Sequence, residues 1–180
     1  MATITYKLLS VNADVLSLSE SWLTSTIDDR SASIPGYSLL RTDRGLPGLT
    51  ENRQWRQGGG VACYVREAIK YTILYSPTVE HINDVQFLDF ELHLDRQKLL
   101  FISVYRLPDG RVLNGLFKFY QSVCHRYNHV VMVGDFNVDM RAGIQEYHTT
   151  ELRSHIEQSL WIWYHLSQPI TIARLERGLI

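Results

Sequence analysis

The sequence predicts an α/β protein in which sheets pack together and helices lie on the outside. Three observations lead to this prediction. Short apolar segments suited to strands recur along the 180 residues, residues 85–94 alternate apolar and polar side chains, and residues 112–127 carry apolar side chains at helical spacing. A chain of this length is most simply one domain with a substantial core, which we expect to span residues 1–180.

The first part of the chain alternates helix-like and strand-like segments. The expected elements are a short helix at Tyr6–Asn12 and strands at Val15–Ser19, Tyr37–Arg41, Val61–Arg66 and Tyr71–Tyr75. A loop rich in Arg and Gly leads to Gly58-Gly59-Gly60. No Lys-Ser/Thr follows these glycines, as it would in a P-loop, so we interpret them as a flexible connection to the next strand.

The clearest strand prediction is Val85–Leu94, where Leu88, Phe90, Leu92 and Leu94 share one face. Asp89 and Glu91 fall on the other face, which we expect to be solvated.

The remaining elements follow from apolar runs and spacing. Leu99–Val104 is apolar on both faces, as in a strand covered on two sides, and Val130–Val133 is a second such run. Helices are expected at Val112–Tyr127 and Thr150–Leu160.

Composition narrows the function classes without choosing one. Hydrophobic residues make up 45% and charged residues 21%, typical of a soluble globular chain, and the net charge is −1. Any attraction to nucleic acid must therefore come from a local group of basic side chains.

The cysteines and the apolar segments indicate where the protein resides. Cys63 and Cys124 suit free thiols in a reducing compartment, although a disulfide bond between them is an open alternative. No segment suits a membrane span or signal peptide, so we expect an intracellular protein of the nucleus or cytoplasm that does not bind membranes.

The most informative motif is Gly134-Asp135-Phe136-Asn137, directly after an apolar run. Alternation places Asp135 and Asn137 on one side and turns Phe136 into apolar packing, while Gly134 permits a close approach. Asp-x-Asn alone is more often only a polar turn at the end of a strand.

Two further strand-like segments also end in polar side chains, Glu20 and Tyr105. Two carboxylates, a carboxamide and a phenol at one rim would suit magnesium-assisted attack on a phosphodiester, because Mg²⁺ takes few protein carboxylates and accepts phosphate oxygens. In that arrangement Asn137 would orient a water or a phosphate oxygen, and Tyr105 would donate to developing charge.

Four motifs together resemble a known superfamily. In order they are Leu18-Ser19-Glu20-Ser21-Trp22-Leu23, Gly58-Gly59-Gly60-Val61-Ala62, Val104-Tyr105-Arg106-Leu107-Pro108 and Gly134-Asp135-Phe136-Asn137. They resemble the endonuclease/exonuclease/phosphatase superfamily, with its DNase I-like fold, and in particular the apurinic-type endonuclease domain of non-LTR retrotransposons. The loop Tyr37–Arg44 points the same way.

This resemblance implies a DNase I-like four-layered α/β sandwich, a divalent metal (Mg²⁺ or Mn²⁺) and cleavage of a phosphodiester in DNA. It further implies that Glu20 is a metal ligand and that Tyr105, Asp135 and Asn137 are catalytic.

The sequence also departs from the family pattern, as a domain truncated at both ends would. The first strand with its active-site asparagine and the final Ser-Asp-His are missing, although 166–174 resembles the family segment rich in Gln, Pro, Thr and Arg. Loss of a general acid/base lowers a rate by about 10²–10⁴-fold. The alternative is therefore a non-catalytic remnant that binds metal or nucleic acid weakly at most. A third reading, a phosphatase for a small phosphoester in the same superfamily, is disfavoured by the resemblance of the loop Arg41–Arg44 to the retrotransposon type.

A basic loop offers one candidate contact with DNA. Arg41, Arg44, Arg53 and Arg56, with Trp55 among them, suit a phosphate backbone and a stacked base. An ordinary solvated loop explains the same residues equally well.

Overall fold

The computed structural model describes residues 12–43, 59–74, 85–95, 97–108, 114–141, 143, 146–158 and 170–173. These residues form two four-stranded sheets. The first sheet has the strand order β2-β3-β1-β8, with every neighbouring pair antiparallel. Its strands are β1 (Val15–Ser19), β2 (Tyr37–Thr42), β3 (Val61–Arg66) and β8 (Ile170–Ala173).

The second sheet has the order β4-β5-β6-β7. Its strands are β4 (Lys70–Ile73), β5 (Val85–Leu94), β6 (Gln97–Arg106) and β7 (His129–Asp135). The first three are antiparallel, whereas β6 and β7 are parallel and have helix α3 (Asn114–Val123) between them in the chain. Parallel strands end at the same edge of a sheet, so the chain leaves β6 and β7 side by side.

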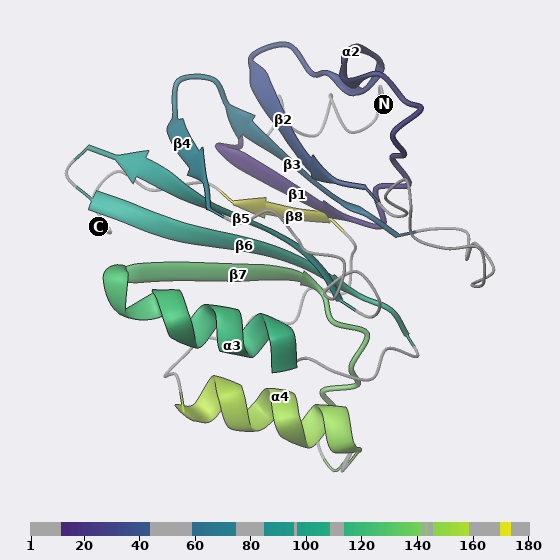
Figure 1. The fold of residues 1–180 in the computed structure, drawn as a ribbon, viewed down its shortest axis with the longest axis vertical. Coiled ribbons are helices and arrows are strands. Elements are labelled where there is room, and N and C mark those ends of the chain that lie inside the picture. The colour runs from purple at the N-terminus through teal and green to yellow at the C-terminus, as the bar shows by residue number, and fades with distance from the viewer. Residues whose placement is uncertain are drawn as a thin grey trace.

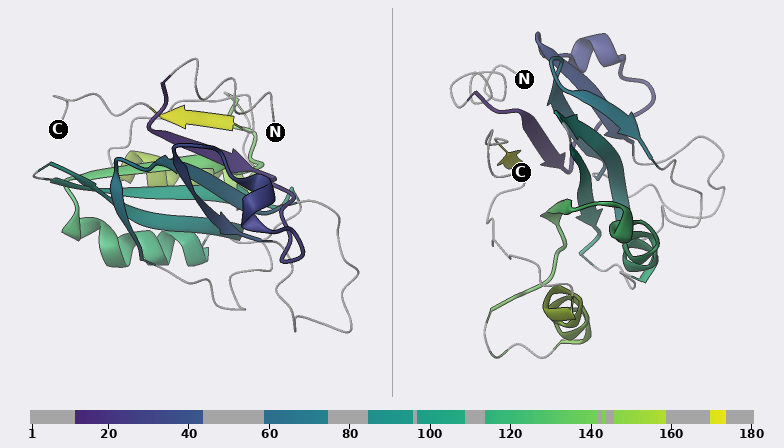
Figure 2. Two further views of the ribbon diagram at one scale, coloured as in Figure 1. Left: turned by 90° about the horizontal axis from the view of Figure 1, so that it is seen from above. Right: turned by 90° about the vertical axis from the view of Figure 1, so that its left-hand side faces the viewer.

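The helices lie outside the two packed sheets (Figure 1). Helix α3 and helix α4 (Tyr147–Gln158) lie on the outer side of the second sheet, and the short helix α2 (Asp29–Ala32) lies beside the first sheet near β2. The two turned views in Figure 2 show the same separation of sheets and helices. None of the helices in the described part of the chain combines the length and apolar character needed to cross a bilayer.

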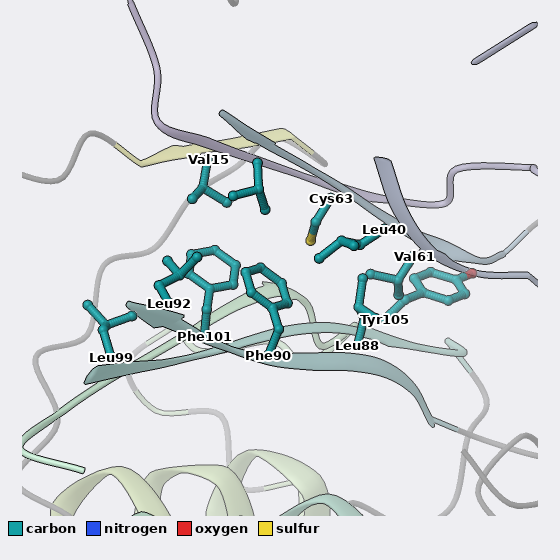
Figure 3. Packing of buried hydrophobic residues seen from close by; sticks show 11 residues of the cluster. Val15, Leu40, Val61, Cys63, Leu88, Phe90, Leu92, Leu99, Phe101 and Tyr105 are labelled. Atoms are coloured by element: carbon teal, nitrogen blue, oxygen red, sulfur yellow. The ribbon is translucent and has the colours of Figure 1, made fainter. Parts of the chain in front are cut away.

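The space between the sheets is filled by apolar side chains from both of them (Figure 3). Val15, Leu40 and Val61 extend from the first sheet, and Phe90 and Phe101 meet them from the second, with their rings stacked at 5.1 Å between centroids. The apolar face predicted for β5 therefore forms half of the central core. A second cluster joins the opposite face of β5 and β6 to α3 and α4.

Most of the predicted elements are present. The helix predicted at 112–127 is an α-helix at Asn114–Val123 followed by the 3₁₀-helix η2 (Cys124–Arg126), and the last helix begins at Tyr147 instead of residue 150. Strand β8 was not predicted as a strand. The helix predicted at Tyr6–Asn12 lies, apart from Asn12, outside the described residues.

The prediction of a solvated polar face on β5 was wrong. Asp89 is completely buried and Glu91 is nearly so, because helix α3 and its neighbours cover this face of the sheet as well. Phe87, on the same face, packs against Phe119 of α3 at 5.4 Å between ring centroids. Cys63 and Cys124 are free thiols, as expected, although Cys124 is only partly buried.

Candidate active site

The predicted site residues from β6 and β7 lie side by side at the edge where these parallel strands end. Tyr105 is in register with Asp135, and Val104 with Gly134. Gly134 has φ +141°, and a Cβ at this position would overlap the carbonyl of Val104. Only glycine therefore allows β7 to come this close to β6, as the sequence predicted.

Strand β1 brings the third part of the predicted site to the same edge. Glu20 follows the last residue of β1, and its Oε1 accepts a hydrogen bond of 2.6 Å from the phenol of Tyr105. The two residues are 85 positions apart in sequence and come from different sheets. The structure thus brings Glu20 and Tyr105 together at one edge.

The Asp135–Asn137 segment is a tightly held turn. The Asn137 amide N–H donates to Asp135 Oδ1 at 2.9 Å, and Asn137 Nδ2 donates to the Arg106 carbonyl at 2.6 Å. Arg106, almost completely buried, donates through Nη1 to the carbonyls of Phe136 and Asn137 at 3.3 and 3.0 Å. The end of β6 thus fixes the turn after β7, and Phe136 is buried in the outer apolar cluster as predicted.

Ser19 connects the two halves of the site and was not among the predicted site residues. Its hydroxyl donates to the carbonyl of Val104 at 3.0 Å and accepts the amide N–H of Asp135 at 3.1 Å. One buried hydroxyl therefore ties the end of β1 to the ends of β6 and β7. The signal in the sequence was a serine directly before Glu20, at the end of a strand that is apolar apart from Ser17, since a buried hydroxyl needs a partner.

The turn that contains Glu20 is also held from the side of β3. The amides of Ser21 and Trp22 donate to the carbonyls of Gly60 and Gly59 at 3.1 and 2.9 Å. The amide of Gly60 donates in turn to Oε1 of the buried Gln86 at 2.6 Å. The last two glycines of the triplet thus support the Glu20 turn, which goes beyond the predicted role of a flexible connection.

The donor set at this rim fits a hard divalent cation. In the described part of the chain, Oε2 of Glu20 and Oδ2 of Asp135 accept no hydrogen bond, since Tyr105 and Asn137 bind the other oxygen of each carboxylate. No three His, Cys, Asp or Glu side chains group there into a complete metal site. Mg²⁺ commonly binds to one or two carboxylates, with waters and substrate phosphate as its other ligands.

Among the four arginines proposed to contact DNA, only Arg41 lies in the described residues. Its side chain is 17% exposed and forms ion pairs with Asp29 at 3.1 Å and Asp43 at 3.2 Å. Its Nη2 also donates to the carbonyl of Thr24 at 3.3 Å. Arg41 therefore anchors the segment that follows Glu20. Arg44, Arg53, Arg56 and Trp55 lie outside the described residues.

Comparison with known proteins shows the fold. The sequence matches no protein-family model and no curated protein. Among solved structures, a D. rerio TDP2 humanized by 14 mutations is 14% identical with a TM-score of 0.50, and the match covers 77% of this chain and 55% of that one. The catalytic domain of human Nocturnin with bound sulfate is 13% identical, with a TM-score of 0.51 and coverages of 77% and 56%.

A conserved protein of unknown function from Enterococcus faecalis V583 is 16% identical with a TM-score of 0.52, and the match covers 84% of this chain and 62% of that one. These likenesses show that the chain has the DNase I-like α/β fold predicted from its motifs. The chain spans less than two thirds of the length of each of these structures.

Proposed function

We propose that this chain is a metal-dependent phosphodiesterase domain that cleaves DNA, of the type found in non-LTR retrotransposons. The observation that carries the proposal is the meeting of Glu20, Tyr105 and Asp135 at one rim. The phenol of Tyr105 contacts Glu20, and the hydroxyl of Ser19 contacts the amide of Asp135. The fold shared with TDP2 and the catalytic domain of Nocturnin supports the proposal, as do the four motifs quoted above.

The proposed chemistry assigns a separate task to each side chain. A divalent metal bound at Glu20 would polarise the phosphoryl group and stabilise the leaving oxygen. Tyr105 orients the Glu20 carboxylate through its hydrogen bond and places a phenol beside the phosphate.

On the other side of the rim, Asp135 uses one oxygen to hold the amide of Asn137 and directs the second toward an attacking water. The Asn137 carboxamide is fixed by its bond to the Arg106 carbonyl, so its oxygen is oriented to position the same water or a phosphate oxygen.

The proposed DNA contact of Arg41 has a specific requirement. Its guanidinium would have to exchange Asp29 or Asp43 for a phosphate group. Burial, the largest influence, raises the pKa of Asp43, while the Arg41 charge lowers it. A phosphate, which carries its charge at any pH near neutral, would compete most easily with Asp29, whose side chain is the more exposed of the two.

Nicking of supercoiled plasmid with Mg²⁺ tests the proposal. The test variant is Asp135→Ala. The matched control is Asp139→Ala, which removes a nearby carboxylate that forms an ion pair with Arg141. We expect the unaltered chain and Asp139→Ala to nick the plasmid. The nicking rate should fall by at least about 100-fold in Asp135→Ala and on addition of a chelator.

Two results would contradict the proposal. One is the absence of nicking above the Asp135→Ala background in a sample that unfolds cooperatively on heating, which would favour the non-catalytic alternative. The other is nicking that survives both Asp135→Ala and the chelator, which would indicate a contaminating nuclease.

A further inference from the structure

Trp22 is a large aromatic side chain that is exposed directly beside the candidate site. Its exposed fraction is 57%, and it follows Glu20 by two residues, so their Cα atoms lie within about 8 Å. Among the described residues, the other strongly exposed large hydrophobic side chains lie elsewhere: Ile73 and Leu74 at β4 and Tyr147 at the start of α4. An indole joins a large flat apolar face to a polar N–H, and this side chain is enriched at contact surfaces.

The backbone holds Trp22 in an unusual conformation. Glu20 has φ +55° and Trp22 has φ +57°, in the left-handed region that bulky side chains rarely adopt. Such strain persists only where the surroundings enforce it, and it is concentrated at functional sites. No packing requirement explains the strain at Trp22, since most of its side chain is in solvent.

Hydrogen bonds on both sides enforce this conformation. The amide of Trp22 donates to the carbonyl of Gly59 at 2.9 Å, and the guanidinium of Arg41 donates to the carbonyl of Thr24, two residues further on, at 3.3 Å. Arg41 is itself held by Asp29 and Asp43. The segment from Glu20 to Thr24 is therefore fixed at both ends. It therefore holds the backbone of Trp22 at a defined place, two residues along the chain from the carboxylate that would bind the metal.

We propose that Trp22 is a stacking platform for a nucleobase adjacent to the scissile phosphate. This inference rests on the proposed function and adds a substrate class to it, namely DNA that is single-stranded or locally unpaired at the cleavage site. A flat aromatic face binds any unpaired base by stacking, whereas a base inside a duplex already stacks on its neighbours. A fixed platform also loses little conformational entropy when the base binds.

Binding measurements in an Asp135→Ala background test the inference without requiring cleavage. Trp22→Phe keeps an aromatic ring, and Trp22→Leu keeps apolar bulk but has no ring; both retain the same backbone requirement. The probe is a fluorescein-labelled oligothymidylate of ten nucleotides with Mg²⁺, followed by fluorescence anisotropy. Tyr147→Leu serves as the matched control, because it removes an exposed aromatic ring on α4.

We expect Trp22→Leu to raise the Kd for the oligonucleotide by about 5- to 100-fold, while Trp22→Phe and Tyr147→Leu change it by less than about 3-fold. A strand of the same length with abasic sites in place of the bases should bind equally to all four proteins. Equal affinity of the Leu and Phe variants for oligothymidylate would overturn the inference. An equal loss in Trp22→Leu for the abasic strand would also overturn it, because the loss would then reflect backbone contact or folding.

The inference and the proposed function can fail separately. Plasmid nicking with no ring-specific loss of binding would refute the stacking platform and leave the endonuclease proposal intact. Ring-specific binding in a chain that does not nick DNA would support Trp22 as a base-binding residue and refute the catalytic proposal.

Discussion

Two glutamate–tyrosine pairs occur toward opposite ends of the β5–β6 hairpin, and they have different surroundings. In the candidate site, Tyr105 donates to Glu20 at 2.6 Å; toward the other end, Tyr127 donates to Glu91 at 3.0 Å. Both pairs join residues remote in sequence, and in both a phenol orients a carboxylate. The hydrogen bond between phenol and carboxylate alone therefore does not distinguish a candidate active site from a structural contact.

The difference lies in charge compensation. Glu91 Oε1 also receives Lys98 Nζ at 2.8 Å and His93 Nε2 at 2.9 Å. Burial raises the pKa of Glu91, but the hydrogen bonds from Lys98 and Tyr127 and the charges of Lys98 and His93 outweigh it, and the net pKa is lowered. In the described part of the chain, Glu20 has no ion pair with Lys, Arg or His. A carboxylate whose charge is uncompensated can attract a metal ion, whereas one already neutralised stabilises the fold.

Asp89 is a third carboxyl group with different surroundings from those of Glu20 and Glu91. Its side chain is completely buried, and neither carboxylate oxygen has a hydrogen-bond partner among the described residues. Burial raises its pKa to about 7. Because of this burial, the carboxyl group keeps its proton in the folded state below about pH 7 and becomes a buried anion above it.

The largest expected effect separates the two pairs directly. Glu20→Gln should lower metal-dependent cleavage by about 10²–10³-fold, because the amide keeps the hydrogen bond with Tyr105 but loses the charge that attracts the metal. Thermal unfolding should change little, since among the described residues Glu20 has no ion pair to lose. The test is plasmid nicking with melting on the same sample; retained nicking would mean that Glu20 is not a ligand.

The next effect concerns Asp89. Because the pKa is raised from 3.8 to about 7, the unfolded chain ionises first, and stability falls as pH rises between these values. Asp89→Asn should therefore stabilise the chain at pH 8 by about 4 kcal/mol and have little effect near pH 4. Guanidinium unfolding at the two pH values measures this difference. A pH-independent effect of the substitution would show that the carboxyl group does not titrate in this range.

Glu91→Gln should have the opposite pH dependence. The pKa of Glu91 is lowered from 4.5, so its contribution is present above pH 4.5 and is lost as pH falls through the folded-state value. We expect a cost of about 1–2 kcal/mol at pH 7, because Lys98 is 61% exposed and its ion pair is screened by solvent. The cost should shrink as the pH falls below 4.5. DNA cleavage by Glu91→Gln should equal that of the unaltered chain. A loss of cleavage would contradict the conclusion that the Glu91–Tyr127 pair serves only the stability of the fold.

The smallest effects come from the phenols. Tyr105→Phe should lower cleavage by about 10-fold with little change in stability, because Glu20 loses its orienting partner. Tyr127→Phe should cost about 1 kcal/mol in stability and leave cleavage unchanged, because it removes one of several partners of Glu91. Nicking rates and unfolding curves of the two variants should therefore show a loss of cleavage only for Tyr105→Phe and a loss of stability only for Tyr127→Phe. Similar losses of activity in both variants would contradict it.

Much of the fold, and the position of the candidate site residues at strand ends, could be predicted from local patterns. Val85–Leu94 is a strand with the predicted bounds, and its apolar face lies in the core. Gly134 has the close backbone contact that was expected of it. Glu20, Tyr105 and Asp135 lie where their strands end, because the end of an apolar run marks the edge of a sheet.

Other features depend on packing between segments that are remote in sequence. The sequence does not show that the Ser19 hydroxyl joins β1 to β6 and β7, because these contacts form only when the two sheets pack together. Asp89 and Glu91 looked solvated because the alternation of β5 does not show that α3 covers its second face. The positive φ of Trp22 likewise depends on the carbonyl of Gly59.

The sequence by itself therefore determined most of the strands, although not β8, and which carboxylates stand at their ends, because alternation and the end of an apolar run are properties of one segment. Only the tertiary structure decided which partners each carboxylate has. Glu91 meets Lys98 and Tyr127, Asp89 is buried with no hydrogen-bond partner among the described residues, and Glu20 meets the phenol of Tyr105. The charge state of a side chain depends on the desolvation and the partners supplied by other segments, and these exist only when the sheets and helices have packed.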